Sequence, residues 1–561
     1  MNGWVRHVAA LGCLLPGLAS CPGWTQPVPG QRPGDSRPEL PTFEPPAVQP
    51  GAVLPLVTPP VESGIGHPGE TLFVREVRIS GNTVLEPAQL DALTASYVNR
   101  EVSFAELIAL RDRITLEYVR RGFATSGAVL PDQEVKDGIV RIEINEGYLT
   151  SVEIETDGRY QVGYLEQRIR RAAPGPVNVQ RLEEQLRLLQ ADERIASLHA
   201  TLTPGEQPGE SVLHIELSER RAMQFDTDIS NNQSPSIGAD NASLQLSHVN
   251  LRGIGDEIRA QYRVSEGLDA IEAGYRSPVG TRGTELELHG YTTRSTVVES
   301  PFDTLDIESR SRTYALTLHQ SLQRSLGRSQ DLSVSAERRS SESSLLGIPF
   351  SFDAAADNGE IELAVLRVTH ELTRSSPKQV LAVRSTLSWG LDAFGATAHS
   401  ASVPDGQFVA CLGQFQWARR LGDRGWELGA RLDAQLANDA LPGLEQLAVG
   451  GSTSVRGYRE YLLVRDNGLV GSIEARMPVL HSNVGTPRLE LAYFVDAGRS
   501  WNDGESGAAD TLWSAGVGLR WRFAQWGGME LQWAKAFTDV APTIDHDLQD
   551  DGVSYRIWSH L

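Results

Sequence analysis

Two runs of strict two-residue alternation lie on either side of a glycine-rich stretch near residue 450. Every second position from 426 to 436 is apolar, and the same pattern returns from 473 to 479. The apolar members are Trp426, Leu428, Ala430, Leu432, Ala434 and Leu436 before the stretch, and Ile473, Ala475, Met477 and Val479 after it. Successive side chains of a strand point to opposite faces, so each run predicts a strand between an apolar medium and a polar one. The connection of about thirty residues is long, and loops of that length are functional or disordered.

The same alternation recurs from Ala222 to Leu561. Its clearest apolar positions are Leu489, Leu491, Tyr493, Val495 and Ala497; Trp513, Ala515, Val517, Leu519 and Trp521; Met529, Leu531 and Trp533; and Val553, Tyr555, Ile557 and Leu561. With the run at 470–479 these segments give five strands after the glycine-rich stretch. A region of this length holds about sixteen strands, an even number typical of bacterial transmembrane β-barrels. A soluble β-sandwich is the alternative, and the polar opposite faces favour the barrel.

Residues 71–220 show a different pattern, which occurs twice. The first copy predicts strands at 72–80, 126–130 and 139–145 and helices at 87–98 and 103–122, the second helix beginning at a capping box made by Ser103 and Glu106. The second copy predicts strands at 151–155, 198–203 and 212–217 and helices at 163–171 and 179–189. An internal repeat of this kind indicates tandem modules, here two α+β units at 71–149 and 150–220.

The N-terminus has the pattern of an exported protein. Arg6 precedes a short apolar core, which predicts a signal peptide at 1–21. Leu18-Ala19-Ser20-Cys21 fits either a lipoprotein box, which leaves Cys21 acylated, or ordinary cleavage, which we favour. Residues 22–70 are dense in proline, which removes backbone donors, and are therefore expected to form an extended linker.

Composition excludes several classes of function. The formal net charge of -21 argues against nucleic-acid binding, since phosphates favour basic proteins. No apolar run after the N-terminus is long enough for a transmembrane helix. Three cysteines give neither a disulfide framework nor a metal-ligand cluster, and no glycine-rich ATP motif occurs. We therefore expect no cofactor and no metal, and no set of serine, histidine and carboxylate residues stands out as catalytic.

Four short segments in the first module carry a family resemblance. These are Ile79-Ser80-Gly81-Asn82-Thr83, Tyr118-Val119-Arg120-Arg121-Gly122-Phe123, Leu130-Pro131-Asp132-Gln133 and Glu146-Gly147. They resemble the first polypeptide-transport-associated (POTRA) domain of the transporters of two-partner secretion. Such a domain offers a sheet edge to which an unfolded polypeptide can add as a strand.

The alternating region resembles the same family. The segments are Asn250-Leu251-Arg252-Gly253-Ile254-Gly255-Asp256, Ser388-Trp389-Gly390-Leu391-Asp392, Leu441-Pro442-Gly443-Leu444-Glu445-Gln446, the loop motif Val455-Arg456-Gly457-Tyr458, and the wall motif Phe494-Val495-Asp496-Ala497-Gly498. The resemblance implies that the long loop is the sixth extracellular one and folds back into the pore. Two features depart from the family: the proline-rich linker does not suit a plug helix, and the last residue, Leu561, is not aromatic.

The resemblance and the strand phase together predict one contact. Asp496 faces the lumen with Glu490 and Phe494, so this shielded carboxylate requires a cationic partner. The planar fork of Arg456 can bind it through two hydrogen bonds, and Gly457 lets the backbone approach the wall. The predicted site therefore consists of Val455, Arg456, Gly457 and Tyr458 in the loop and Phe494, Asp496 and Gly498 in the wall.

The sequence as a whole predicts a β-rich membrane protein: a barrel of about sixteen strands at 221–561 preceded by two POTRA domains. We expect a monomer in the Gram-negative outer membrane, with periplasmic POTRA domains that bind an exported partner protein (an adhesin, a cytolysin or a toxin). One alternative is a barrel-assembly insertase, which usually has more POTRA domains. Another is a passive porin, which needs none. The third, an enzyme embedded in a barrel, has no supporting set of residues.

Overall fold

The computed structural model describes residues 71–561 except 172, 400–402, 423–424, 482–486, 504–509, 525 and 541–543. Residues 1–70 lie outside the described part of the chain. They include the expected signal peptide with Cys21 and the proline-rich linker, where a plug helix would be found. The chain divides into two compact units. One contains 222–249 and 256–561, and the other contains the two modules before residue 222 together with Asn250–Gly255. No helix in the described part of the chain is long and apolar enough to cross a membrane.

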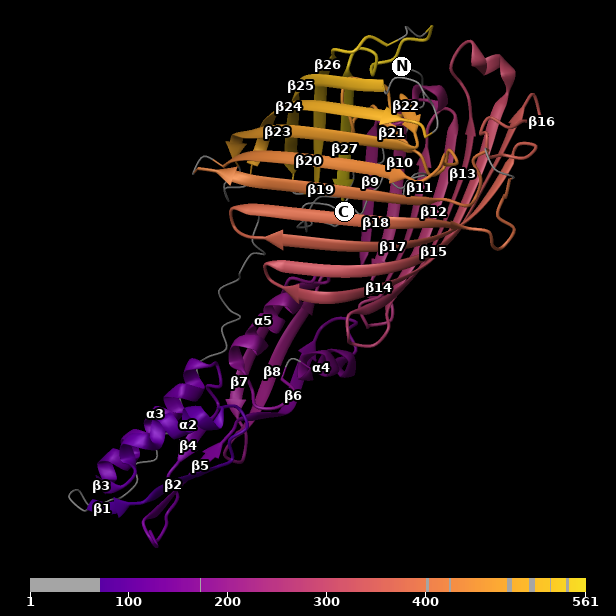
Figure 1. Cartoon of the computed structure of the whole chain (residues 1–561). Helices are drawn as coiled ribbons and strands as arrows, with labels where there is room; N and C mark the ends of the chain where they lie inside the picture. Colours follow the sequence, from indigo (N-terminus) through magenta and orange to yellow (C-terminus); the bar gives the residue numbers. More distant parts are fainter. Residues whose placement is uncertain are drawn as a thin grey trace. The chain divides into compact units, whose positions relative to one another are not determined.

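The first unit is a closed antiparallel barrel of sixteen strands (Figure 1). The strands are β9 (Met223–Ser230), β10 (Asn241–Val249), β11 (Glu257–Val264), β12 (Leu268–Pro278), β13 (Thr284–Thr296), β14 (Ile307–Ser325), β15 (Arg328–Leu345), β17 (Glu360–Ser375), β18 (Gln379–Leu391), β19 (Val409–Leu421), β20 (Trp426–Ala437), β23 (Asn467–His481), β24 (Pro487–Trp501), β25 (Asp510–Ala524), β26 (Gly527–Ala536) and β27 (Val553–His560). The two-residue β16 (Ile348–Pro349) adds to the end of β15. Pairing of β27 with β9 closes the barrel, and the terminal Leu561 exchanges two backbone hydrogen bonds with Phe225. The predicted number of strands is confirmed.

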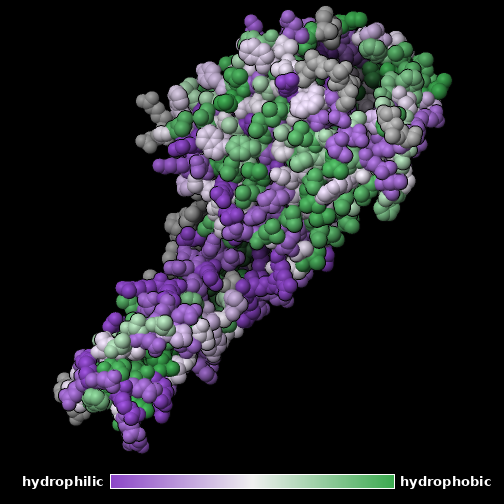
Figure 2. Space-filling model, in the orientation of Figure 1, coloured by the Kyte–Doolittle hydropathy of each residue, from purple (hydrophilic) through white to green (hydrophobic). Residues whose placement is uncertain are grey.

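The two faces of each strand differ as the alternation predicts. On β24, Tyr493 and Val495 are each 54% exposed, whereas Phe494 and Asp496 are buried inside the barrel. Figure 2 shows apolar residues gathered over the outer surface of the barrel. Leaving such side chains in water costs about 1.5–3 kcal/mol each relative to burial, so this surface suits lipid.

The first module is built on a three-stranded sheet covered by helices. Its elements are β1 (Thr71–Val74), β2 (Glu76–Ser80), α2 (Pro87–Thr94), the short 3-10 helix η2 (Ala95–Tyr97), β3 (Arg100–Ser103), α3 (Phe104–Arg120), β4 (Gly127–Val129) and β5 (Ile139–Asn145). The sheet order is β2-β5-β4, with β2 parallel and β4 antiparallel to β5. Leu107, Leu110, Ile114 and Tyr118 place the apolar stripe of α3 in the core.

Two sequence predictions in this module were wrong. The single strand expected at 72–80 is broken at Arg75, and β1 pairs with β3 instead of continuing into β2. The pattern did not reveal β3 because it has only four residues, two of them charged. The helix expected at 87–98 ends at Thr94 and continues only as η2.

The capping box at the start of α3 is confirmed. The Ser103 hydroxyl accepts from the Glu106 backbone at 3.3 Å, and the Glu106 carboxylate accepts from the Ser103 backbone at 2.8 Å. Arg100 also donates to Glu106 at 2.8 Å. The backbone hydrogen bond from Ser103, followed by the one from Arg100, lowers the pKa of Glu106 to about 2.

The second module repeats the arrangement. Its elements are β6 (Tyr148–Thr156), α4 (Val162–Arg170), α5 (Val179–Gln190), β7 (Ile195–Pro204) and β8 (Glu210–Glu219), with sheet order β6-β8-β7. Strand β6 begins two residues before the boundary expected at 150. The modules meet where Val179 donates to the Gly122 carbonyl at 2.8 Å. Gly122 has a φ of +89, and a Cβ there would lie 2.8 Å from the Asn178 side chain, so this junction requires glycine.

Candidate functional site

The site lies inside the barrel, on the connection between β20 and β23. This segment, residues 438–466 and hereafter the long loop, contains the paired short strands β21 (Leu447–Val449) and β22 (Leu463–Arg465). It is the sixth connection on its side of the barrel in strand order, as expected. Val449, Val455 and Tyr458 are buried together with Val470 of β23 and Leu512 of β25. The long loop therefore enters the lumen and packs against the inner wall.

Arg456 and Asp496 form the predicted two-pronged contact. Nε of Arg456 lies 2.7 Å from Oδ2 of Asp496, and Nη2 lies 2.9 Å from Oδ1. The backbone N–H of Arg456 also donates to Oδ2 at 3.1 Å. The Asp496 side chain is 0% exposed and that of Arg456 is 8% exposed. A paired, charge-assisted contact of this kind fixes orientation as well as distance.

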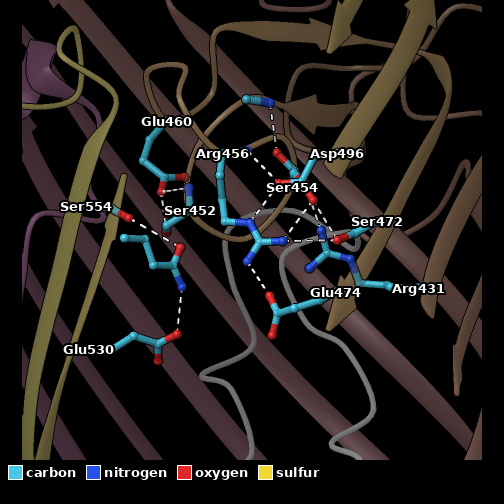
Figure 3. Close-up of polar contacts among 12 residues, drawn as sticks. Arg431, Ser452, Ser454, Arg456, Glu460, Ser472, Glu474, Asp496, Glu530 and Ser554 are labelled. Atoms are coloured by element: carbon cyan, nitrogen blue, oxygen red, sulfur yellow. Dashed lines mark hydrogen bonds and ion pairs between the residues drawn. The ribbon is translucent and has the colours of Figure 1, made fainter. Parts of the chain in front are cut away.

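Three further wall residues contact Arg456, and Figure 3 shows two of them, Ser472 and Glu474. Nη1 lies 2.5 Å from Glu474, and Nη2 donates to Ser472 at 3.1 Å. The guanidinium also lies over the Phe494 ring, 3.3 Å from its centre. Sequence reasoning assigned no role to Ser472 and Glu474, although both lie on the polar face of β23. Their presence means that Arg456 is held by two neighbouring strands, β23 and β24.

The remaining predicted residues make room for the loop or attach it. Gly457 has a φ of +89, and a Cβ there would lie 2.9 Å from the carbonyl of Ala534, so the close approach that glycine allows is to β26. Gly498 leaves space for Val455, since its Cβ would lie 2.9 Å from that side chain. The Tyr458 hydroxyl donates to the Trp513 carbonyl at 2.8 Å. The structure thus brings both motifs into one contact region.

Arg459 attaches the tip of the long loop to two other connections. Its Nη1 lies 2.5 Å from Glu299, between β13 and β14, and its Nε and Nη2 lie 2.5 and 2.7 Å from Asp550, between β26 and β27. Sequence reasoning missed this residue. Only its position directly after the loop motif could have indicated it.

Comparisons with known proteins show the family to which the chain is similar. Residues 209–521 match the family model described as haemolysin secretion/activation protein ShlB/FhaC/HecB, and residues 72–147 match the ShlB-type POTRA domain. The chain is 27% identical over 482 residues to the outer membrane transporter CdiB of Escherichia coli O6:K15:H31 (strain 536 / UPEC), covering 82% of this chain and 79% of that protein. It is 25% identical over 494 residues to CdiB of Dickeya dadantii (strain 3937), covering 83% of each.

A solved structure supports the fold. The structure of CdiB from Escherichia coli superimposes with a TM-score of 0.69 at 22% identity, covering 90% of this chain and 94% of that one. At this identity the likeness concerns the fold alone. The family match covers more than half of the sequence, and the barrel and POTRA architecture fits the Gram-negative outer membrane. The chain therefore belongs to the haemolysin secretion/activation protein ShlB/FhaC/HecB family, the outer-membrane transporters of two-partner secretion.

Proposed function

We propose that this chain, acting as a monomer, takes up one large partner protein through POTRA domains at 71–149 and 150–220 and exports it through the barrel at 221–561. In the resting state the long loop obstructs the lumen. The single observation that supports this is the buried contact of Arg456 with Asp496, because it holds loop residues against the inner wall. The partner is an adhesin, a cytolysin or a toxin.

Uptake would occur by strand addition. In the second module β7 lies at one edge of the sheet and pairs only with β8 among the described residues. The other edge strand, β6, already contacts the segment before α5 through the bridge of Tyr148 with Pro176. An unfolded chain that adds to the ten-residue edge of β7 gains backbone hydrogen bonds without a requirement for one sequence. Folding of the partner outside the cell would then prevent its return.

Secretion by an Arg456→Ala variant tests the proposal. The variant should insert into the outer membrane but lose most export of the partner protein, because the long loop has lost its contact with β23 and β24. The measurement is the amount of that protein outside the cell, normalised to folded, heat-modifiable barrel. Arg522→Ala is the matched control, since this lumenal arginine contacts Glu490 at 3.5 Å and donates to the Pro487 carbonyl at 3.2 Å, and both of these residues lie on β24. Wild-type export by Arg456→Ala would overturn the proposal.

A further inference from the structure

A second buried ion cluster holds the beginning of the long loop, on a different part of the wall. Glu445 lies eight residues after the end of β20, and its side chain is 1% exposed. Arg339 of β15 places Nη1 at 2.5 Å from Oε1 of Glu445. Arg367 of β17 places Nη2 at 2.7 Å from Oε1 and Nη1 at 3.0 Å from Oε2. None of these three residues belongs to the loop motif or the wall motif.

The cluster is balanced in charge. Besides Glu445, Arg367 contacts Glu337 of β15 at 3.0 Å and donates to the Ser388 hydroxyl at 2.6 Å. Two guanidinium groups and two carboxylates therefore meet at one site, where Arg339, Arg367 and Glu445 are buried and Glu337 is partly buried. A buried ion pair is costly to break from one side, because the remaining charge keeps its desolvation penalty. The loop thus contributes one of the two carboxylates that this part of the wall needs.

The two ion clusters lie on separate parts of the barrel. Glu445 contacts β15 and β17, whereas Arg456 contacts β23 and β24, and strands β18, β19 and β20 lie between them. Ten residues of the long loop, 446–455, connect the two points. Contacts on two different wall segments fix both the place and the direction of a segment, which a single contact cannot do.

Hydrogen bonds join the cluster to both ends of the long loop. Gln435 of β20 donates to the carbonyls of Glu445 and Asp466, at 3.0 and 3.1 Å. Asp466, directly before β23, accepts from the backbone of Leu441 at 2.9 Å and from the side chain of Gln446 at 2.9 Å. These hydrogen bonds link Glu445 to both ends of the long loop. We call residues 441–446 and Asp466 the root of the loop.

Apolar packing alone does not fix this root. Leu441 belongs to a buried cluster with Ile361, Leu363 and Phe408. Such packing has no preferred direction, whereas the two-pronged contact of Arg367 with Glu445 does. A cavity also lies beside the root, lined on the wall side by Ser311 and Ser341 and on the loop side by residues 441, 443, 444 and 446. This space leaves the root room to shift once the ion cluster is broken.

We propose that Glu445, held by Arg339 and Arg367, is a positioning residue that sets where the root of the long loop rests and thereby how completely the lumen is closed. This inference rests on the proposed function, in which the long loop obstructs the pore. The Glu445 contact is separate from the Arg456 contact, because it involves β15 and β17 and lies nearer to the start of the long loop. It predicts that the pore opens when the root is released, even while Arg456 stays bound to Asp496.

The test is the single-channel conductance of the purified full-length chain in planar lipid bilayers. The variant Glu445→Gln with Arg339→Gln removes one charge of each sign and leaves Arg367 paired with Glu337, so the wall stays balanced. We expect a heat-modifiable barrel as in the unaltered chain and about a fivefold or larger increase in the fraction of time spent in high-conductance states. Glu371→Gln is the matched control. Its carboxylate lies on β17, like Arg367, and contacts Arg384 at 2.5 Å.

Two conservative variants separate positioning from general stability. Nη1 of Arg339 donates both to the Glu445 carboxylate and to the Leu444 carbonyl, and a lysine ammonium can make the same two contacts, so Arg339→Lys should leave the fraction of time in high-conductance states unchanged. Arg367 uses two nitrogens on that carboxylate, and since lysine lacks the fork, Arg367→Lys should raise the conductance. Should the double variant fail to fold, this pair of single variants still decides the matter. A role in folding alone would change heat modifiability and leave the conductance of the folded fraction unaltered.

The outcomes distinguish this inference from the proposed function. If Arg456→Ala opens the pore and the Glu445 variants do not, Glu445 does not position the loop, while the obstruction by the long loop stands. If neither opens the pore, the obstruction itself is wrong, and this inference falls with it. Opening by the Glu445 variants together with a silent Glu371→Gln supports the inference. Equal opening by Glu371→Gln overturns it, because any loss of lumenal charge would then suffice.

Discussion

The two α+β modules and the barrel are stabilised in opposite ways. The modules bury leucine and isoleucine, and Leu110, Leu182 and Leu213 are 0% exposed. The barrel carries its large apolar side chains outside and buries charged ones within, among them Asp496 at 0%. The modules are stabilised mainly by the burial of apolar side chains, which has no preferred direction. A buried residue there can therefore be replaced by another of similar volume. In the lumen the long loop is held by directed ion pairs as well as by apolar packing, and a paired, charge-assisted contact fixes orientation as well as distance.

The largest expected effect comes from the directed contact. Arg456→Ala and Asp496→Ala should each abolish most export while the barrel still inserts, because the first leaves Asp496 buried without the guanidinium that holds it, and the second leaves Arg456 paired with Glu474 but without its two-pronged contact. Combining the two should cost little more than either alone, as expected for partners in one interaction. Arg456→Lys should restore export only partly, since lysine lacks the fork.

The measurement is the amount of partner protein secreted by each single variant and by the double variant. Together these amounts give the coupling between Arg456 and Asp496. Fully additive losses would show that Arg456 and Asp496 act separately. That result would remove the contrast between the lumen and the module cores.

Features that depend on neighbouring positions in the sequence could be predicted, and contacts between distant positions could not. The barrel strands were predictable because lipid on one side and water on the other impose alternation on every strand. Arg456 with Asp496 was predictable only because a resemblance named the pair and the strand phase gave Asp496 its direction. Glu445 and Arg339 are separated by 106 positions, and their contact depends on how the barrel closes. No local pattern carries that information.

In the modules the apolar stripe of α3 was predictable from its period, and its core gives the next largest effect. Leu110→Ala should lower the free energy of unfolding of the segment 71–220 by about 2–5 kcal/mol, because it deletes a fully buried side chain and leaves a cavity. Leu116 lies on the same helix but is 48% exposed. Leu116→Ala is therefore the matched control and should change stability by less than about 0.5 kcal/mol.

Urea unfolding followed by circular dichroism measures both variants. Leu110→Met keeps the volume and should cost less than about 1.5 kcal/mol. Equal losses for Leu110→Ala and Leu116→Ala would contradict a core stabilised by burial.

The smallest effect concerns the directed contact that the modules do contain. Glu146 accepts from the backbone of Thr83 at 2.6 Å, from that of Val84 at 3.1 Å and from the Tyr118 hydroxyl at 2.8 Å. Burial acts to raise the pKa of Glu146, but these hydrogen bonds, first those from Thr83, hold it below 4.5. Because the carboxylate is partly exposed, solvent screens its contacts. Glu146→Gln should therefore destabilise the segment 71–220 by only about 1–2 kcal/mol at pH 7.

The sign of the pH dependence follows from that lowered pKa. A carboxylate whose pKa is lower in the folded state stabilises the fold above its unfolded pKa of 4.5, and this stabilisation is lost as the pH falls through the folded value. The unaltered segment should therefore lose stability below pH 4.5, and Glu146→Gln should lose less. The stability of the variant should still fall somewhat as the pH falls below 4.5, because Glu106, with a pKa of about 2, loses its stabilising contacts over the same pH range. Urea unfolding at pH 7, 4.5 and 3 measures the slopes, and identical slopes for the two proteins would show that Glu146 is not held by these hydrogen bonds.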